Sequence, residues 1–587
     1  MTLRRDRASA LARAARAGRL LGSALLLAAV AWPAAARSRE EVSRKFQKSL
    51  PLPAGQRLSI DHSHGDVQIT THREPTVQID ATIRVSSSDR ERAEKFAQDI
   101  RIAVEQTASG VSIRTVYPEK SWSFPGGGFV SYSVDYEVVM PETAALTLRN
   151  RFGDVAVDGL KAAGEIVNSN GKLSFRGGAG RQRLENSFGS IELAGNAGDA
   201  AVVNGNGTVT VSDVEGELDV RNRFGRTTVS RVGKRCVVAG SNGDVALDGA
   251  GTSAAVTTSF GKADVRNVAG DLSVQNSNGS VTVAVVGGRA ELTASFGAIS
   301  FSEMRQGVGV TGTNCSVSGR RIAGDVVVRN TFGPVELADV GGAADVENSN
   351  GKIRVRDVKG PARLTTRFGE IDAAGIGGDA TVSDSNGTVT LANVDGAADV
   401  RNSFGQTSVT RARKGAKVIS GNGRVALSDV GAAAYVKTSF GQVEASQVDG
   451  GLTVDNSNGG VRASDIKGNA TVRTSFAPVT LDGIGGAVDV DNQNGAVDVR
   501  MTGPRGKECG KISLKSSFAP IRLALDPQGG YRIAARTSFG KVSSELPLLA
   551  PGASASDAVS GTIGDGRCEV ILTNSNGNIE IAKGPGR

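Results

Sequence analysis

A short corner motif recurs every 18 residues along most of this chain, in which phenylalanine and asparagine alternate and are nearly always followed by glycine. Loops drift in length where nothing constrains them, so an unbroken spacing of this kind predicts stacked coils rather than independent hairpins. The phenylalanine corners are Phe152, Phe188, Phe224, Phe260, Phe296, Phe332, Phe368, Phe404, Phe440 and Phe476. The asparagine corners are Asn170, Asn206, Asn242, Asn278, Asn314, Asn350, Asn386, Asn422, Asn458 and Asn494.

Two strands can be read in each coil. Apolar residues stand three and usually five positions after the corner, as Val209 and Val211 do after Asn206, and this alternation marks a strand with one buried face. A second apolar position comes fourteen residues after the corner, and the residue two before it is mostly small, often alanine, which predicts a narrow core. We therefore expect an all-β, single-stranded β-helix (β-solenoid) of 18-residue coils in a 36-residue double repeat. Twenty coils would give a rod of roughly 100 Å at ~4.8 Å per coil.

The corners also predict a polar ladder. Glycine follows each corner residue because a turn with positive φ costs glycine little. Two residues before the corner, asparagine recurs, and stacking would let each amide bond its neighbours above and below. The predicted ladder consists of Asn168, Asn186, Asn204, Asn222, Asn276, Asn330, Asn348, Asn402 and Asn456.

The phenylalanine corners allow two interpretations. Rings about 9.6 Å apart, with an asparagine coil between them, could pack as structural corner fillers or form an aromatic stripe that binds a ligand. A stripe would need polar partners at a repeating position, and the second residue after the corner varies freely (Asp154, Lys172, Ser190, Thr208). The sequence therefore favours corner packing.

The two ends depart from the repeat. Residues 1–36 combine six arginines, an apolar run and Ala34-Ala35-Ala36, which predicts a secretory signal peptide and an exported protein, periplasmic, extracellular or associated with the cell envelope. Residues 37–150 are expected to form an N-terminal cap, residues 151–500 the regular array, and residues 501–587 irregular C-terminal coils and a cap. No later stretch is apolar enough to suggest a transmembrane span in the mature chain.

Within the N-terminal cap, Ser88-Asp89-Arg90-Glu91 predicts the start of a short helix that runs to about Ile102. Strands are expected near 111–117 and 132–140, on either side of an aromatic loop. That loop holds Trp122, Phe124 and Phe129, which either contact a partner or cover the open end of the solenoid; the sequence favours the cover.

The histidines and cysteines suggest no cofactor or metal. His62 and His64 fit the ladder and corner positions of an early, isolated coil, since His62-Ser63-His64-Gly65-Asp66-Val67 has the form of Asn150-Arg151-Phe152-Gly153-Asp154-Val155. That alignment, which leaves His72 outside it, favours a structural role over a metal site. Cys236 and Cys315 are too far apart to pair, whereas Cys509 and Cys568 could form a disulfide in an oxidising compartment.

Several of these features together resemble the bacterial putative-adhesin β-solenoid family of secreted repeat domains. They are the leader, the coil Gly65-Asp66-Val67-Gln68-Ile69, a helix-containing insertion, Tyr117-Pro118, the strand 134–141, the Asn-Gly coils and Gly564-Asp565-Gly566. The resemblance implies a secreted or cell-envelope β-helix, with a role in adhesion.

Two functions follow from the sequence. The favoured one is a non-enzymatic rod, an adhesin or envelope scaffold, that binds a surface, polysaccharide or protein partner through many weak contacts. The alternative is a carbohydrate-active lyase or hydrolase on a β-helix, but residues 152–494 contain no break that would mark an active site. Removing the leader lowers the net charge from +8 to about +3 (8 − 5), so the basic composition does not indicate nucleic acid.

Overall fold

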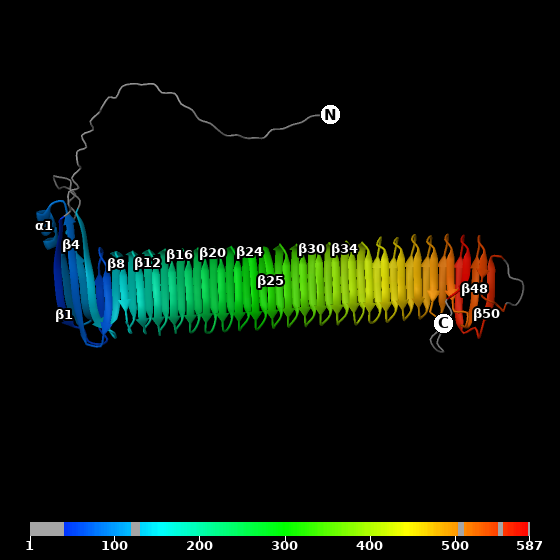
Figure 1. Ribbon diagram of the computed structural model, residues 1–587, viewed down its shortest axis with the longest axis horizontal. Helices are drawn as coiled ribbons and strands as arrows, with labels where there is room; N and C mark the ends of the chain where they lie inside the picture. Colours follow the sequence, from blue (N-terminus) through cyan, green and yellow to red (C-terminus); the bar gives the residue numbers. More distant parts are fainter. Residues whose placement is uncertain (1–39, 119–129, 503–509, 550–555, 585–587) are drawn as a thin grey trace, which may run out of the picture.

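The computed structural model describes residues 40–118, 130–502, 510–549 and 556–584. In these residues the chain forms fifty-two β-strands and one α-helix, and the strands stack into a long, straight rod (Figure 1). Between the two ends, successive coils follow one another in sequence order. The structure is a β-solenoid, which confirms the predicted fold class.

Each coil of the array contributes one strand to each of two parallel sheets. Inside the array, strands pair in register with the strand 18 residues earlier and the strand 18 residues later, as in Val202↔Val220 and Val211↔Val229. Equivalent residues therefore stack in columns along the rod. This in-register stacking turns the 18-residue period of the sequence into straight rows of side chains on the surface.

Sheet 1 contains the strands that approach the Phe or Asn corner. Its regular members are β8 (Ala145–Phe152), β10 (Gly164–Asn170), β12 (Gln182–Phe188), β14 (Ala200–Asn206), β16 (Leu218–Phe224), β18 (Cys236–Asn242), β20 (Ala254–Phe260), β22 (Leu272–Asn278), β26 (Val326–Phe332), β28 (Ala344–Asn350), β30 (Ala362–Phe368), β32 (Ala380–Asn386), β34 (Ala398–Phe404), β36 (Ala416–Asn422), β38 (Ala434–Thr438), β40 (Leu452–Asn456), β42 (Ala470–Thr474) and β44 (Val488–Asn492).

Sheet 2 contains the strands that leave the corner. Its regular members are β9 (Val155–Asp158), β11 (Leu173–Gly178), β13 (Ile191–Asn196), β15 (Val209–Val214), β17 (Thr227–Val232), β19 (Val245–Ala250), β21 (Ala263–Val268), β23 (Val281–Val286), β27 (Val335–Val340), β29 (Ile353–Val358), β31 (Ile371–Ile376), β33 (Val389–Val394), β35 (Thr407–Ala412), β37 (Val425–Val430), β39 (Val443–Val448), β41 (Val461–Ile466), β43 (Val479–Ile484) and β45 (Val497–Met501). Two longer strands, β24 (Ala290–Met304) and β25 (Val308–Ile322), run through the corner and belong to both sheets.

The core lies between the two sheets and is as narrow as the alanine-rich pattern predicts. Position twelve after the corner is buried in the array, where Ala200, Ala254 and Cys236 occupy it. Cys236 and Cys315 are both buried free thiols. Burial raises the pKa of Cys236 to about 12, so this thiol stays protonated and acts as a small core residue.

The corner opposite the Phe and Asn residues contains a backbone feature that the sequence analysis missed. The seventh residue after each corner adopts a left-handed conformation in most coils, although it is often not glycine: Asp213 has φ 59°, Arg231 φ 52° and Asp339 φ 57°. The strain is repeated coil after coil because the next residue, such as Val214, must turn inward to close the core. Exposed polar residues tolerate this position, so no glycine pattern marks it.

At the N-terminal end, the first coil of the chain is not the outermost one, because a later segment stacks on its outer side. Strands β2 (Arg57–Asp61) and β3 (Val67–His72) pair on one side with β8 and β9, and on the other side with β6 (Gly110–Val116) and β7 (Ser131–Pro141). The outer coil is then covered by antiparallel strands: β5 (Arg101–Thr107) pairs with β6, while β4 (Thr76–Ser87) pairs with β7 and β1 (Glu40–Pro51) pairs with β4. The helix α1 (Arg90–Asp99) lies against β1 and β4 (Figure 1).

The helix begins where the sequence predicts it but ends earlier. The side chain of Asp89 accepts a hydrogen bond from the Arg92 amide and caps the first turn. The predicted end at Ile102 is wrong, because Ile100 is already extended and Arg101 begins β5, whose pairing with β6 replaces helical hydrogen bonds.

The C-terminal end repeats the same arrangement. The coil of β46 (Ile512–Ser516) and β47 (Ile521–Leu525) stacks on β51 (Cys568–Asn574) and β52 (Ile579–Lys583), which come last in the chain. The outermost coil is instead the earlier pair β48 (Tyr531–Thr537) and β49 (Val542–Ser544), with β50 (Ala558–Ile563) antiparallel to β48. At both ends a segment distant in sequence thus closes the stack and pairs strand edges that would otherwise be free.

The early histidine coil lies where the sequence alignment places it. His64 bridges in parallel to Phe152, and their rings stack with centroids 5.2 Å apart. His62 is buried, its Nδ1 lies 3.0 Å from the Thr115 hydroxyl, and its ring meets Tyr136 edge-on. No group of three potential metal ligands forms in the described part of the chain.

Because His62 is buried, we expect the N-terminal cap to lose stability at acidic pH. Burial, together with the nearby His64, lowers the pKa of His62 to about 4 from 6.5. Because the folded pKa is depressed, the stability that neutral His62 contributes is complete above about pH 6.5 and is lost as the pH falls toward 4, by up to ~3 kcal/mol. Hydrogen exchange of β2 and β6 at pH 7 and pH 4.5 should show this loss.

His62→Asn provides the matched control for this cap, since Asn150 occupies the equivalent position in the next coil of the stack. The variant should flatten the pH dependence of exchange relative to the wild type. An equal acid response in both proteins would show that other groups cause it.

Candidate binding surface

The phenylalanines of the corners lie in one straight row on the surface. In-register pairing stacks Asn170 between Phe152 and Phe188, and this alternation continues along the array, so successive rings stand about 9.6 Å apart. We call the corner residues from Phe152 to Asn494 the Phe–Asn row.

The rings of this row are exposed, which differs from the expected corner packing. Their exposed fractions run from 42% at Phe224 to 67% at Phe440, and the two phenylalanines of the C-terminal coils, Phe518 and Phe539, are at 64% and 80%. The interior of the corner is already filled by the side chain two residues earlier. A ring at the corner therefore has to lie outside the core.

That interior side chain is the asparagine of the predicted ladder. The ladder asparagines are buried at the corner, but most of their hydrogen bonds differ from the expected amide-to-amide chain. Asn186 Nδ2 donates to the Gly171 carbonyl at 2.9 Å, and Asn348 Nδ2 donates to the Gly333 carbonyl at 2.8 Å. Direct bonds between ladder amides occur at only two places in the described residues, for example Asn204 to Asn222 at 3.3 Å.

The remaining ladder residues follow the same rule. Each side-chain amide donates to the backbone carbonyl 15 residues earlier. That carbonyl belongs to the residue that directly follows the Phe or Asn corner of the preceding coil. The ladder residues that do so are Asn168, Asn222, Asn276, Asn330, Asn402 and Asn456, whereas Asn204 bonds the carbonyl of its own corner, Gly207. The ladder thus satisfies the carbonyls of a tight turn that would otherwise be buried without partners.

A column of small polar residues accompanies the row, and the sequence analysis missed it because it considered only the second residue after the corner. The residue immediately before the corner is Ser twelve times, Thr twice, Gly twice, Gln once and Arg three times among the twenty coils, with no Asp or Glu. None of these positions is buried. The exposed rings therefore have the repeating polar partners that a binding stripe needs.

Between neighbouring rings the surface is hollowed. Phe188 and Phe224 border a groove of about 630 Å³ that crosses the Asn206 coil, with Ser187 and Arg223 among its lining residues. The Arg223 guanidinium lies 5.5 Å from the centroid of the Phe224 ring. Glu185, which also lines the groove, is ion-paired with Arg183.

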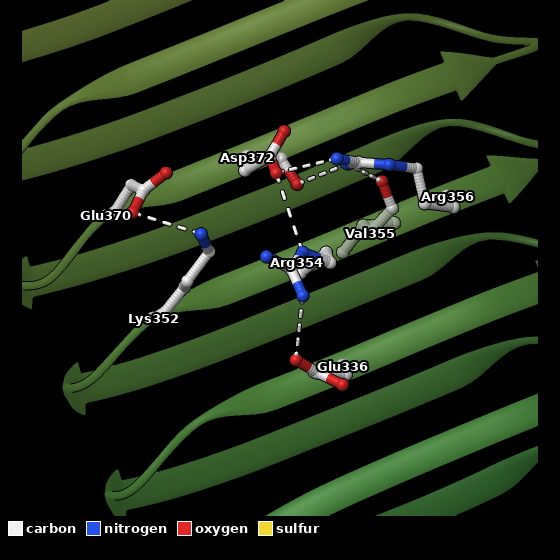
Figure 2. A network of polar contacts seen from close by, with 7 residues as sticks. All are labelled: Glu336, Lys352, Arg354, Val355, Arg356, Glu370 and Asp372. Atoms are coloured by element: carbon white, nitrogen blue, oxygen red, sulfur yellow. Dashed lines mark hydrogen bonds and ion pairs between the residues drawn. The ribbon is translucent and has the colours of Figure 1, made fainter.

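The outer face of sheet 2 has a different character, because its charges neutralise one another. Figure 2 shows Arg356 donating to Asp372 at 2.6 Å, Arg354 donating to Glu336 at 3.1 Å, and Lys352 paired with Glu370 at 3.0 Å. Burial alone would raise the pKa of Asp372, but the bond from Arg356 and the neighbouring cations hold that pKa below its ordinary value. The opposite corner likewise contains stacked pairs such as Asp213 with Arg231.

Trp122, Phe124 and Phe129 lie outside the described residues, as does Cys509. Cys568 is disulfide-bonded. No helix in the described ranges is both long enough and apolar enough to cross a membrane.

No family model and no curated protein sequence matches the chain. A solved structure that does match is the crystal structure of a putative cell adhesion protein from Clostridium sporogenes ATCC 15579, at 9% sequence identity, over 40% of this chain and 100% of that chain. The TM-score is 0.15, so this likeness has no bearing on the function.

Proposed function

We propose that this protein is an exported, non-enzymatic rod of the adhesin or envelope-scaffold type, which binds an extended surface, polysaccharide or protein partner through the Phe–Asn row. The observation that supports this most is the exposure of ten phenylalanines at a fixed two-coil interval along one edge. Monomeric proteins rarely expose this many large apolar side chains along one edge without a partner. A straight row of identical contacts suits a partner that is itself long and repetitive.

The energetics of such a row favour avidity over single-site affinity. One half-exposed ring offers only a weak contact. On a rigid rod, however, the translational and rotational entropy is lost once, when the first ring binds, and the later rings bind without a further loss of this kind. The rigidity comes from the paired sheets and the ladder, which hold the corners at one spacing.

Two observations support export. The N-terminal sequence has the composition of a signal peptide, and Cys568 is disulfide-bonded, which is typical of oxidising compartments.

The alternative, a carbohydrate-active lyase or hydrolase, is less well supported. Strand pairing continues in register from β8 to β44 with no inserted loop, and the carboxylates beside the groove and on the sheet 2 network are engaged in ion pairs. A catalytic acid or base would need a carboxyl group freed from such pairs.

Replacing three consecutive rings tests the proposal. Phe368, Phe404 and Phe440 are 54–67% exposed, so changing them together to serine should leave the fold intact while interrupting the row. We expect the triple variant of residues 37–587 to bind envelope preparations and a glycan array about tenfold more weakly than the wild type.

The control for this experiment replaces Val237 and Val327 with serine and Tyr435 with phenylalanine, because these partly exposed side chains lie on the outer face of sheet 1 away from the corner. It should bind like the wild type. Undiminished binding by the corner variant would refute the row as the binding surface.

A further inference from the structure

Basic residues outnumber acidic ones at the positions that flank the Phe–Asn row, although Lys172 and Arg424 pair with Glu192 and Glu444 beyond those positions. At the residue before each corner and the second residue after it, the twenty coils place Arg151, Lys172, Arg223, Arg226, Lys262, Lys352, Arg367 and Arg424 against only Asp154, Asp244 and Glu370, an excess of five (8 − 3). The three acids are already engaged. Asp154 accepts from the Lys172 amide at 2.7 Å, Asp244 accepts from the Lys262 amide at 2.9 Å, and Glu370 pairs with Lys352.

Three of the cations are placed differently from the rest. Arg151, Arg223 and Arg367 each immediately precede a phenylalanine, are exposed, and form no ion pair with any described residue. They stand four and eight coils apart, which is ~19 and ~38 Å along the rod. Each is therefore an exposed arginine without an ion pair next in sequence to an exposed phenylalanine, and the Arg223 guanidinium lies over the Phe224 ring.

The groove between Phe188 and Phe224 shows these elements assembled. It combines two aromatic edges, an amide at Asn206, the hydroxyl of Ser187 and the guanidinium of Arg223, while its carboxylate, Glu185, is neutralised by Arg183. Aromatic faces take the apolar faces of sugar rings, amides and hydroxyls bond sugar hydroxyls, and a free guanidinium binds an acidic group in a bidentate manner.

The charge distribution also weighs against two other occupants. A second copy of the rod would bring two rows of the same sign together, which is unfavourable. Single-stranded nucleic acid needs a cation near each phosphate, yet the four coils with corners at Asn278, Phe296, Asn314 and Phe332 carry no charge at the two flanking positions.

We propose that the Phe–Asn row binds a linear acidic polysaccharide, whose rings lie on the phenylalanines and whose carboxylate or sulfate groups pair with Arg151, Arg223 and Arg367. This rests on the proposed function and adds the chemical class of the partner. Sparse cations between neutral, hydroxyl-rich coils match a polymer in which acidic groups are separated by uncharged sugar surface.

The test compares four probes against residues 37–587: polygalacturonate for carboxylates, dextran sulfate for sulfates, hydroxyethylcellulose as a neutral polymer and a single-stranded oligodeoxynucleotide. Arg151, Arg223 and Arg367 are changed together to glutamine. The control changes Arg181, Arg235 and Arg305, which lie at the opposite corner, and so removes the same charge. Affinity electrophoresis at two salt concentrations gives the dissociation constants.

We expect one or both acidic polymers to bind more tightly than the neutral one, and the row variant to lose about tenfold in affinity for them with a weaker salt dependence. The control variant should keep wild-type affinity. Tighter binding of the oligodeoxynucleotide, equal binding of the neutral polymer, or an equal loss in both arginine variants would each overturn the inference.

The serine variant of Phe368, Phe404 and Phe440 separates this inference from the proposed function. If that variant loses envelope binding while acidic polymers neither bind the wild type nor compete with the envelope, the row is a binding surface for a different partner. If the serine variant keeps envelope binding, the proposed function itself fails.

Discussion

Deletion of residues 556–587 is expected to make the rod associate end to end. The deletion removes β50, β51 and β52, and with them the partners of both β47 and β48. The outer coil 531–544 then has no strand to pair with, and β46 and β47 become a bare parallel edge. Unpaired edges with an apolar face template the addition of further strands.

Size-exclusion chromatography with light scattering measures this effect. The intact chain should keep one mass across a concentration series, whereas the truncated chain should grow in mass with concentration. The intact Cys568→Ser variant, run without reductant, isolates the contribution of the lost disulfide. A parallel series in reducing buffer excludes thiol exchange as the cause of association. An unchanged mass for the truncated protein would refute the view that the inserted coil protects the end.

An internal deletion of the same order of size is the matched control. Removing residues 189–224 takes out two whole coils and joins Phe188 to Gly225, so every remaining residue keeps its position in the 36-residue repeat. Because each coil contacts only its neighbours, this shorter rod should fold normally and remain unassociated. The contrast would show that the ends, and not the number of coils, control association.

The regular part of this fold can be predicted from the sequence because every coil has the same length of 18 residues. The 18-residue spacing predicts the coils, the stacking of equivalent residues, the place of the ladder and even the coil of His64, 88 residues before its partner Phe152 (152 − 64 = 88). Each of these depends only on which residues share a position in the repeat. In-register pairing then gives the contacts.

Three features of the structure could not be predicted from the repeat, each for a physical reason. The order of strands at the ends depends on pairing between distant segments that lack the repeat, such as β2 with β6. The left-handed residue at the opposite corner is masked by polar side chains such as Asp213. Whether a corner ring lies inside or outside depends on what already fills the corner, and the buried Asn186 decides this for Phe188.

Asp384→Asn is expected to stabilise the rod at neutral pH, which is unusual for a substitution at a buried polar residue. Asp384 occupies a ladder position, in register with Thr366 and Asn402, and is buried. Burial raises the pKa of Asp384 to about 6, although the amides of Asn386 and Ser385 oppose the shift. At pH 7 the native state therefore holds a poorly solvated carboxylate.

The ladder shows what an amide would gain at this position. Asn402 Nδ2 donates to the Gly387 carbonyl at 3.0 Å, and the equivalent acceptor for residue 384 is the Gly369 carbonyl. A carboxylate cannot donate, and Asp384 Oδ2 is buried with no hydrogen-bond partner in the described residues. Asparagine supplies the donor and removes the charge, which should raise the free energy of unfolding at pH 7 by about 2 kcal/mol.

The raised pKa of Asp384 determines how the stability difference between the variant and the wild type changes with pH. A folded pKa raised above the ordinary 3.8 means that the native state binds the proton more tightly than the unfolded chain. The contribution of protonated Asp384 is therefore complete below about pH 3.8 and is lost as the pH rises through about 6. The advantage of the Asn variant should accordingly be largest at pH 7 and should shrink as the pH falls toward 4.

A solenoid can unfold locally, so the amide hydrogen exchange rates of strands β32 and β34 report this substitution most directly. The midpoint of urea denaturation measures its effect on the whole rod. Asn402→Asp, one coil away in the same ladder, is the reciprocal control and should destabilise the rod at pH 7 and recover on acidification. Equal exchange in Asp384→Asn and the wild type at pH 7 would mean that the carboxylate is solvated. The ladder would then tolerate charge, and its amide-to-carbonyl bonds would not be the reason that asparagine recurs at this position.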